Sequence, residues 1–522
     1  MNWTWVNKPG LLLLSFCIFP TSAAAEAPLS AIDWLSQSVA TPTSLPRAPQ
    51  QLGPLTTEPP VTGGVKSGTI TVAPIGSTNL DSLGLVPASR AGLPRTLWGK
   101  TPSADLARLL RAERPDTLPA VQSLLHMILI AELDPPADSD PQGVLFLARV
   151  DKLLDLGALD PALSLLELLS APQAEAFRRW FDISLLIGQE DRACEVMRKS
   201  PQIAPTFPAR IFCLARGGDW EAAALSLRTG QTLGTIDPQT AELLGRFLDP
   251  DLFEGQPALP IPERPSPLVL RMMEAIGEPI PTGTLPVAFA QADLRSNTGW
   301  KARIEAGERL ARTGAIPPNR LLGLYTEQKA AASGGVWERV RGVQAIESAL
   351  AAGDKQKASA DLLALWPQIE ENELEVPFAN LFGARLAALG LEGDAGALAF
   401  RVGLLSDAYE KVAVAHKPQD STEAFLIGVA RGESGVGTPP DQMGVAIADA
   451  FRPDTRPGEV FSQLLADDQL GAAVLKAIEK VTLGASGDLR DVTDGLVLLR
   501  TTGMEATARR AALELLLLER RG

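Results

Sequence analysis

The chain has 522 residues, a formal net charge of −14 and an aromatic content of only 5%. An acidic chain repels nucleic-acid phosphates and anionic lipid surfaces, so we expect no nucleic-acid partner and no membrane surface held by long-range attraction. Alanine and leucine are abundant while tyrosine is almost absent, and this composition favours helices over sheets.

Residues 1–25 have the pattern of an export signal. Lys8 supplies a positive charge, residues 11–19 form a short apolar run, and Ala23, Ala24 and Ala25 form a small-residue cleavage pattern. The pattern predicts cleavage after Ala25 and a periplasmic protein. Cys17 lies inside the apolar run after a bulky residue, so we interpret it as part of the signal and not as a lipid anchor. No later segment has the length of a membrane-spanning helix, so we expect no integral membrane segment after cleavage.

Residues 26–100 differ in composition from the rest of the chain. Pro, Gly, Ser and Thr are abundant in residues 41–64, and apolar side chains are few. Burial of so few apolar side chains cannot offset the conformational entropy that the segment would lose on folding. We therefore predict a flexible tether over 26–100. Within it, residues 67–75 alternate in a way that predicts a short strand, and residues 93–98 predict an apolar anchor at the end of the tether.

From residue 101 onward the apolar spacing predicts helices almost without interruption. Three aspartates, Asp140, Asp160 and Asp237, stand directly before a proline, and this pair predicts an N-cap followed by the first helical residue. Proline-rich breaks and a glycine-rich break divide the helices into three groups, 101–256, 265–430 and 441–522.

Turns recur with a constant local pattern. Four glycines are each followed five residues later by an alanine: Gly157, Gly188, Gly217 and Gly353. A glycine can end one helix, an acidic residue soon after can cap the next, and the alanine lets the second helix approach the first. The pattern predicts an all-α fold of stacked helical hairpins after the N-terminal region.

These turns resemble the turn between the two helices of tetratricopeptide repeats, over about 150–230 and more loosely over 350–410. The aromatic signature of the first helix of that family is missing, so the resemblance implies a TPR-like α-solenoid. The whole chain also resembles exported proteins of alphaproteobacteria, some of which carry the label antifreeze glycopeptide polyprotein. That label follows from Ala, Thr and Pro richness and implies no binding to ice.

Two cysteines follow the signal, Cys194 and Cys213. In an oxidising compartment this pair can form a disulfide, worth about 3 kcal/mol by chain entropy. A redox-active pair is the alternative, but no Cys-x-x-Cys spacing lowers a thiol pKa here. We therefore predict a structural disulfide between neighbouring helices.

Residues suited to catalysis are scarce. The two histidines, His126 and His416, have no metal-ligand spacing around them, so we expect no metal and no cofactor. Glu433 and Ser434 resemble the catalytic Glu-Ser of lytic transglycosylases, which also carry helical solenoids, but the family's downstream Gly-Leu-Met-Gln segment is missing. We interpret the Gly-rich string around Glu433 as a loop between helices.

These patterns lead to one hypothesis and two alternatives. The hypothesis is a periplasmic scaffold of the cell envelope that binds a protein or peptide and catalyses no reaction. The first alternative is a protein that binds or cleaves peptidoglycan and is related to solenoid-bearing lytic transglycosylases, with Glu433 as its acid. The second is a purely structural envelope protein with no discrete ligand.

Overall fold

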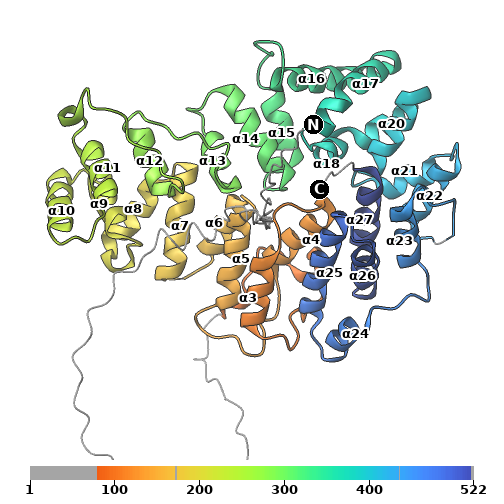
Figure 1. Ribbon diagram of the computed structural model, residues 1–522, viewed down its shortest axis with the longest axis horizontal. Coiled ribbons are helices and arrows are strands. Elements are labelled where there is room, and N and C mark those ends of the chain that lie inside the picture. Colours follow the sequence, from red (N-terminus) through yellow and green to blue (C-terminus); the bar gives the residue numbers. More distant parts are fainter. Residues whose placement is uncertain (1–78, 171–172, 434, 519–522) are drawn as a thin grey trace, which may run out of the picture.

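A computed structural model describes residues 79–170, 173–433 and 435–518, and most of these lie in helices (Figure 1). The predicted all-α fold is confirmed. The strands of this part are the two-residue β1 (Val86–Pro87) and β2 (Ala131–Glu132), which pair in parallel. The predicted signal at 1–25, the Pro-rich residues 41–64 and the predicted strand at 67–75 lie outside the described residues.

Residues 79–100 are packed against the helices and are not a flexible tether, which corrects this end of the predicted tether. Residues 79–100 include the 3-10 turn η1 (Leu80–Ser82), β1 and the short α2 (Ala88–Ala91). Leu97 and Trp98 in this segment are 0% and 1% exposed. Burying such large apolar groups stabilises the packed segment enough to offset its loss of backbone entropy.

Arg149 ties this segment to the helices. Its guanidinium is fully buried and donates to the backbone carbonyls of Leu83, Leu129 and Ala131 at 2.7, 2.8 and 2.8 Å. Burial lowers the pKa of Arg149 to about 10, while the nearby Asp81 acts to raise it. The side chain therefore stays charged at neutral pH, and the three carbonyls provide the hydrogen bonds that a buried cation requires.

An outgoing row of helices follows from the centre of the molecule to one end (Figure 1). It consists of α3 (Ser103–Ala112), α4 (Pro119–Ile130), α5 (Val144–Asp155), α6 (Leu159–Glu167), α7 (Ala174–Ile187), α8 (Glu190–Lys199), η2 (Pro201–Ile203), α9 (Phe207–Arg216) and α10 (Trp220–Thr232). Sequential pairs such as α5 with α6, α7 with α8 and α9 with α10 pack as hairpins.

A returning row then runs back along the first. It consists of α11 (Pro238–Leu248), η3 (Pro250–Phe253), α12 (Pro267–Ala275), η4 (Val287–Phe289), α13 (Ala290–Asp293), α14 (Trp300–Arg312) and α15 (Pro318–Thr326). Helices α12 and α13 pack on α7. The rows are also joined by hydrogen bonds from Gln291 Nε2 to the carbonyl of Gly157 at 2.8 Å and from Thr313 Oγ1 to that of Leu156 at 2.9 Å.

The remaining helices curve around and return to the start. They are α16 (Val336–Ala352), α17 (Lys355–Glu371), α18 (Glu375–Phe378), the π-helical turn η5 (Ala379–Gly383), α19 (Ala384–Leu389), α20 (Gly393–Leu404), α21 (Tyr409–Ala415), α22 (Ser421–Arg431), α23 (Gln442–Ala450), α24 (Glu459–Ala466), α25 (Leu470–Ala485), α26 (Leu489–Thr501) and α27 (Glu505–Leu517). Helix α25 packs on α3 and α4, and α27 packs on α4 (Figure 1). One apolar core runs through all three predicted groups of helices.

We call the contacts of α25 and α27 with Trp98, α3 and α4 the C-terminal junction. Two polar contacts cross this junction: Thr117 and Thr482 lie 2.6 Å apart through their hydroxyl oxygens, and Glu514 Oε2 accepts from the N–H of Ala120 at 2.9 Å. The buried Nε1 of Trp98 has no hydrogen-bond partner among the described residues. Ala120 lies in the first turn of α4, where a backbone N–H has no partner within its own helix. Glu514 therefore caps α4 from the far end of the chain.

The predicted helix starts have mixed outcomes. Asp237 caps α11, with its carboxylate accepting from the N–H of Thr240 at 2.9 Å. The predictions for Asp140 and Asp160 are wrong. Asp140 accepts from Gln142 within a turn before α5, while Asp160 lies inside the first turn of α6. A carboxylate in the first helical turn still interacts favourably with the helix dipole without being a cap.

The glycine turns behave as predicted at most positions. Gly188 and Gly353 end α7 and α16 in the left-handed conformation, with φ of 77° and 66°. At the third turn the left-handed residue is Gly218, and Gly217 has φ −80°. The alanines that follow at Ala162, Ala193 and Ala358 are 0% exposed, which permits the close helix approach that the pattern predicts.

Within the described ranges, no helix is both long enough and apolar enough to cross a membrane. The apolar run at 511–518 near the C-terminal end belongs to α27, whose residues Ala508, Ala511 and Ala512 are buried. This helix therefore packs on the core through its alanine face.

Candidate functional site

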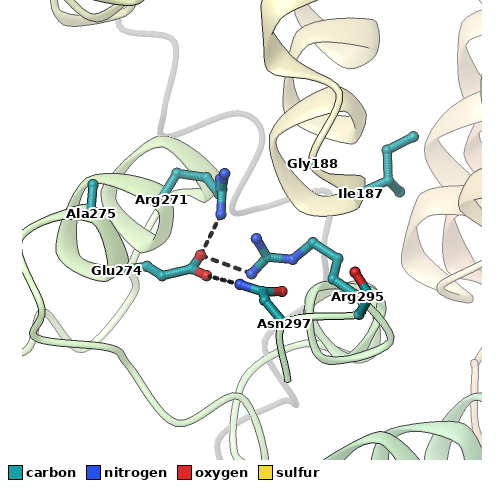
Figure 2. A pocket seen from close by; sticks show the side chains of 8 residues that line it. Ile187, Gly188, Arg271, Glu274, Ala275, Arg295 and Asn297 are labelled. Atoms are coloured by element: carbon teal, nitrogen blue, oxygen red, sulfur yellow. Dashed lines mark hydrogen bonds and ion pairs between the residues drawn. The ribbon is translucent and has the colours of Figure 1, made fainter. Parts of the chain in front are cut away.

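A recess of about 600 Å³ opens where the returning row crosses the end of α7 (Figure 2). Eight residues line it: Ile187, Gly188, Arg271, Glu274, Ala275, Arg295, Ser296 and Asn297. The first two end α7, the next three lie on α12, and the last three follow α13. We call this the charged recess.

Three elements converge here because of local sequence. The left-handed Gly188 ends α7 and leaves room for Arg295, whose Cδ lies 3.1 Å from the position that a Cβ would take on this glycine. Arg295 Nε donates to the carbonyl of Ala292 at 2.7 Å, which fixes the side chain beside the C-terminus of α7. A cation is favourable there because the helix dipole leaves partial negative charge at that end.

The carboxylate of Glu274 is the centre of the recess. Arg295 Nη2 donates to Glu274 Oε2 at 2.8 Å, Arg271 Nη1 donates to the same oxygen, and Asn297 Nδ2 donates to Oε1 at 3.1 Å (Figure 2). Burial alone would raise the pKa of Glu274, but the hydrogen bond from Arg295 and the charge of Arg271 outweigh it and lower the pKa. Glu274 is therefore an anion at neutral pH.

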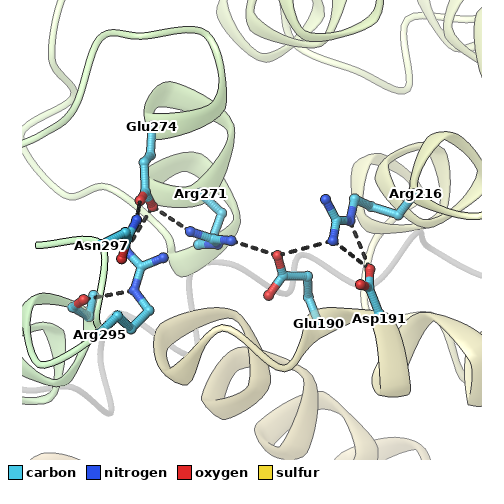
Figure 3. Close-up of polar contacts among 8 residues, drawn as sticks. Glu190, Asp191, Arg216, Arg271, Glu274, Arg295 and Asn297 are labelled. Carbon is cyan, nitrogen blue, oxygen red and sulfur yellow. Dashed lines mark hydrogen bonds and ion pairs between the residues drawn. The ribbon is translucent and has the colours of Figure 1, made fainter.

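The ion pairs continue from the recess to α8 and α9 (Figure 3). Arg271 Nη2 donates to Glu190 Oε1 at 2.6 Å, and Arg216 Nη2 lies 3.7 Å from that oxygen and 2.6 Å from Asp191 Oδ1. Burial acts to lower the pKa of Arg271, yet its bonds to Glu190 and Glu274 raise it. The guanidinium of Arg271 thus bridges two carboxylates from different rows.

Two buried atoms of this network lack a hydrogen-bond partner among the described residues, Arg271 Nε and Glu190 Oε2. Glu190 is only 3% exposed. Leaving buried polar atoms unpaired costs stability, but other buried atoms, such as Trp98 Nε1, are unpaired too. The recess is distinguished by several charged side chains that converge on one carboxylate and remain open to solvent, and we therefore take it as the candidate site.

The predicted disulfide lies next to this network. Cys194 on α8 and Cys213 on α9 are bonded, with Cα atoms 5.0 Å apart, and the two residues are 4% and 2% exposed. The bond fixes α8 against α9, and these helices carry Glu190 and Arg216. Such burial supports the structural interpretation of the pair over the redox-active one.

The two histidines lie on different elements and do not form one site. His126 on α4 is half-buried beside Gly314, and its Nδ1 lies 3.2 Å from the carbonyl oxygen of Gln122. His416 follows α21, stacks on Phe400 with ring centroids 3.7 Å apart, and contacts Glu423 Oε2 through Nε2 at 2.8 Å. The described residues contain no cluster suited to a metal ion.

Glu433 follows the C-terminus of α22 on the surface. Its Oε1 lies 2.8 Å from Arg431 Nη2, and 44% of its side chain is exposed. A general acid in a glycosidase-type site is ordinarily held in a partly apolar cleft that keeps it protonated. The surroundings of Glu433 are instead a solvated ion pair at the end of a helix.

Sequence reasoning missed every charged residue of the recess. Arg271 and Glu274 have the i, i+3 spacing of an ordinary surface pair on a helix. Arg295 and Asn297 lie in a loop, and Glu190 comes from the opposite row. No local pattern connects three such segments, so the signal exists only in the fold.

Comparisons of the chain with protein-family models, with curated proteins and with solved structures found no match. The class that the structure defines is therefore architectural: an all-α protein of helical hairpins with a charged recess between two rows.

Proposed function

We propose that this protein is a periplasmic scaffold of the cell envelope and that a partner peptide binds in the charged recess. The observation that carries the proposal is the recess itself. It offers about 600 Å³ between two packed rows, with donors and acceptors already held in place. Groups fixed before binding lose little entropy when a partner arrives, and this raises affinity.

The export pattern at 1–25 supports the periplasmic location, and the buried disulfide is consistent with an oxidising compartment. The surface ion pair of Glu433 gives no support to cleavage of peptidoglycan. We therefore propose binding without catalysis.

The test is photocrosslinking in living cells. In one variant a photoreactive residue replaces Ser296 in the recess. In a matched control the same residue replaces Leu363, which is 44% exposed on α17. The proposal expects one dominant protein captured from position 296 and not from 363. Capture of peptidoglycan fragments at 296 would favour the wall-binding alternative, and no position-specific product would refute the proposal.

A further inference from the structure

The charged recess already binds a carboxylate, namely that of Glu274. Two guanidinium groups and one amide from two different segments of the returning row converge on its two oxygens (Figure 2). Guanidinium and amide N–H groups are the donors that proteins use to recognise carboxylates. The arrangement therefore shows which chemical group the recess is shaped to hold.

Glu274 is open to solvent in a way that a structural carboxylate is not. Its side chain is 26% exposed, whereas Glu308 on α14, paired with Arg339 at 2.6 Å, is 2% exposed. Glu308 is further enclosed by the hydroxyl of Tyr325, which donates to it at 2.7 Å. Glu308 has no route outward, while a change of rotamer can move Glu274 into solvent.

Both arginines keep a second anchor when Glu274 moves away. Arg271 remains bonded to Glu190 at 2.6 Å, and Arg295 remains bonded to the carbonyl of Ala292 at 2.7 Å. The donors thus stay oriented toward the recess, so an incoming anion does not have to order them.

We propose that the charged recess recognises a carboxylate of its partner, the C-terminal carboxylate of a peptide, and that Glu274 competes with it for Arg271, Arg295 and Asn297. The volume of about 600 Å³ leaves room for the residues before that terminus, beside the apolar side chains of Ile187 and Ala275. This inference depends on the proposed function, because it names the chemistry of the group bound in the same recess.

Competition makes a prediction opposite to that of an ordinary binding residue. Removing the acid in Glu274→Ala frees three donors and is expected to tighten binding of a free carboxylate about tenfold. Arg295→Gln removes a charged donor and is expected to weaken binding about tenfold or more. Arg192→Gln is the matched control, because Arg192 forms an exposed ion pair with Glu167 outside the recess.

The experiment is fluorescence anisotropy with the chain from residue 26 onward and its variants. The probes are labelled Gly-Ala-Ala-Ala with a free C-terminus and the same peptide with an amidated C-terminus. The expected result is binding of the free acid alone, tightest in Glu274→Ala, weakened about tenfold or more in Arg295→Gln and unchanged in Arg192→Gln. If Glu274→Ala does not fold, Glu274→Gln removes the charge at constant size and is expected to shift affinity in the same direction.

Equal binding of the acid and the amide would overturn the inference, and so would unchanged or weaker binding after loss of Glu274. Failure of the peptide with every variant, together with a protein crosslinked from position 296, would reject the carboxylate and leave the proposed function standing. Failure of both experiments would reject the two together.

Discussion

The charged recess and the C-terminal junction both join helices that lie far apart in the sequence, but they do so with opposite chemistry. The junction buries apolar side chains, and Glu514 satisfies a backbone N–H of α4 there at 2.9 Å. The recess is lined by charges and open to solvent. Burial of apolar surface makes the junction a large source of stability, whereas the recess contributes less stability and leaves charged groups accessible to solvent.

The largest expected effect is at the junction. Trp98 is 1% exposed, and its Cε3 lies 2.9 Å from where a Cβ would stand on Gly471 of α25. Trp98→Ala leaves a cavity against α25, so we expect the free energy of unfolding to fall by about 3–5 kcal/mol. Urea unfolding followed by circular dichroism measures this loss.

Trp220→Ala is the matched control, because Trp220 is 50% exposed on α10. We expect that variant to lose less than about 1 kcal/mol. Similar losses for the two tryptophans would mean that the junction contributes no special stability.

The next largest effect on the free energy of unfolding is expected beside the recess, where a disulfide joins two helices. Cys194 and Cys213 are separated by 19 positions, and removing the cross-link in a double Cys→Ala variant is expected to cost about 3 kcal/mol. Hydrogen exchange should show the loss first in α8 and α9, with the junction still protected. Free thiols in protein isolated from the periplasm would contradict the bond and remove the support that the bond gives to an oxidising compartment.

A smaller effect, dependent on pH, is expected at the junction. Burial raises the pKa of Glu113 to about 8, with Glu479 acting in the same direction and Lys152 and Lys476 opposing it. Because the unfolded chain releases this proton from about pH 4.5, the folded state holds it more tightly, and stability falls as the pH rises toward 8.

Glu113→Gln removes that proton and its pH dependence. Between pH 6 and pH 9 we expect the wild-type protein to lose about 2 kcal/mol more than the variant does. Urea unfolding at the two pH values measures the difference. Parallel pH profiles would show that Glu113 titrates alike in the folded and unfolded states.

The smallest change in stability is expected at the recess itself. After Arg295→Gln, Glu274 still accepts from Arg271 and Asn297, so we expect the free energy of unfolding to change by less than about 1 kcal/mol. The same unfolding assay measures it. A fall in the free energy of unfolding comparable to that of Trp98→Ala would mean that the recess stabilises the fold as much as the C-terminal junction does, and the distinction between the two regions would not hold.

The parts of the fold that could be predicted are those encoded locally. The glycine and alanine pattern of turns, the cap by Asp237 and the cysteine pair each depend on a few neighbouring residues, and the structure confirms them. The prediction of a flexible tether was wrong for residues 79–100, because the contacts of this segment, such as that of Leu83 with Arg149, come from helices later in the chain.

The recess could not be predicted for a related reason. The partners of Glu274 come from its own helix and from a loop after α13, and those of Arg271 include Glu190 in the other row. An ion pair leaves no periodic pattern in the sequence, and any of the many acidic residues of this chain could be the partner of a given arginine. Only the crossing of the two rows determines that Glu274 and Glu190 are the partners.

The contact between α27 and α4 also affects how the chain reaches its native state. Synthesis proceeds from the N-terminus, so α4 emerges long before α27 exists. The face of α4 that packs on α27 stays uncovered until α27 has formed. Exposed apolar surface during synthesis favours aggregation. We therefore expect the chain to depend on a holding chaperone until α27 has formed.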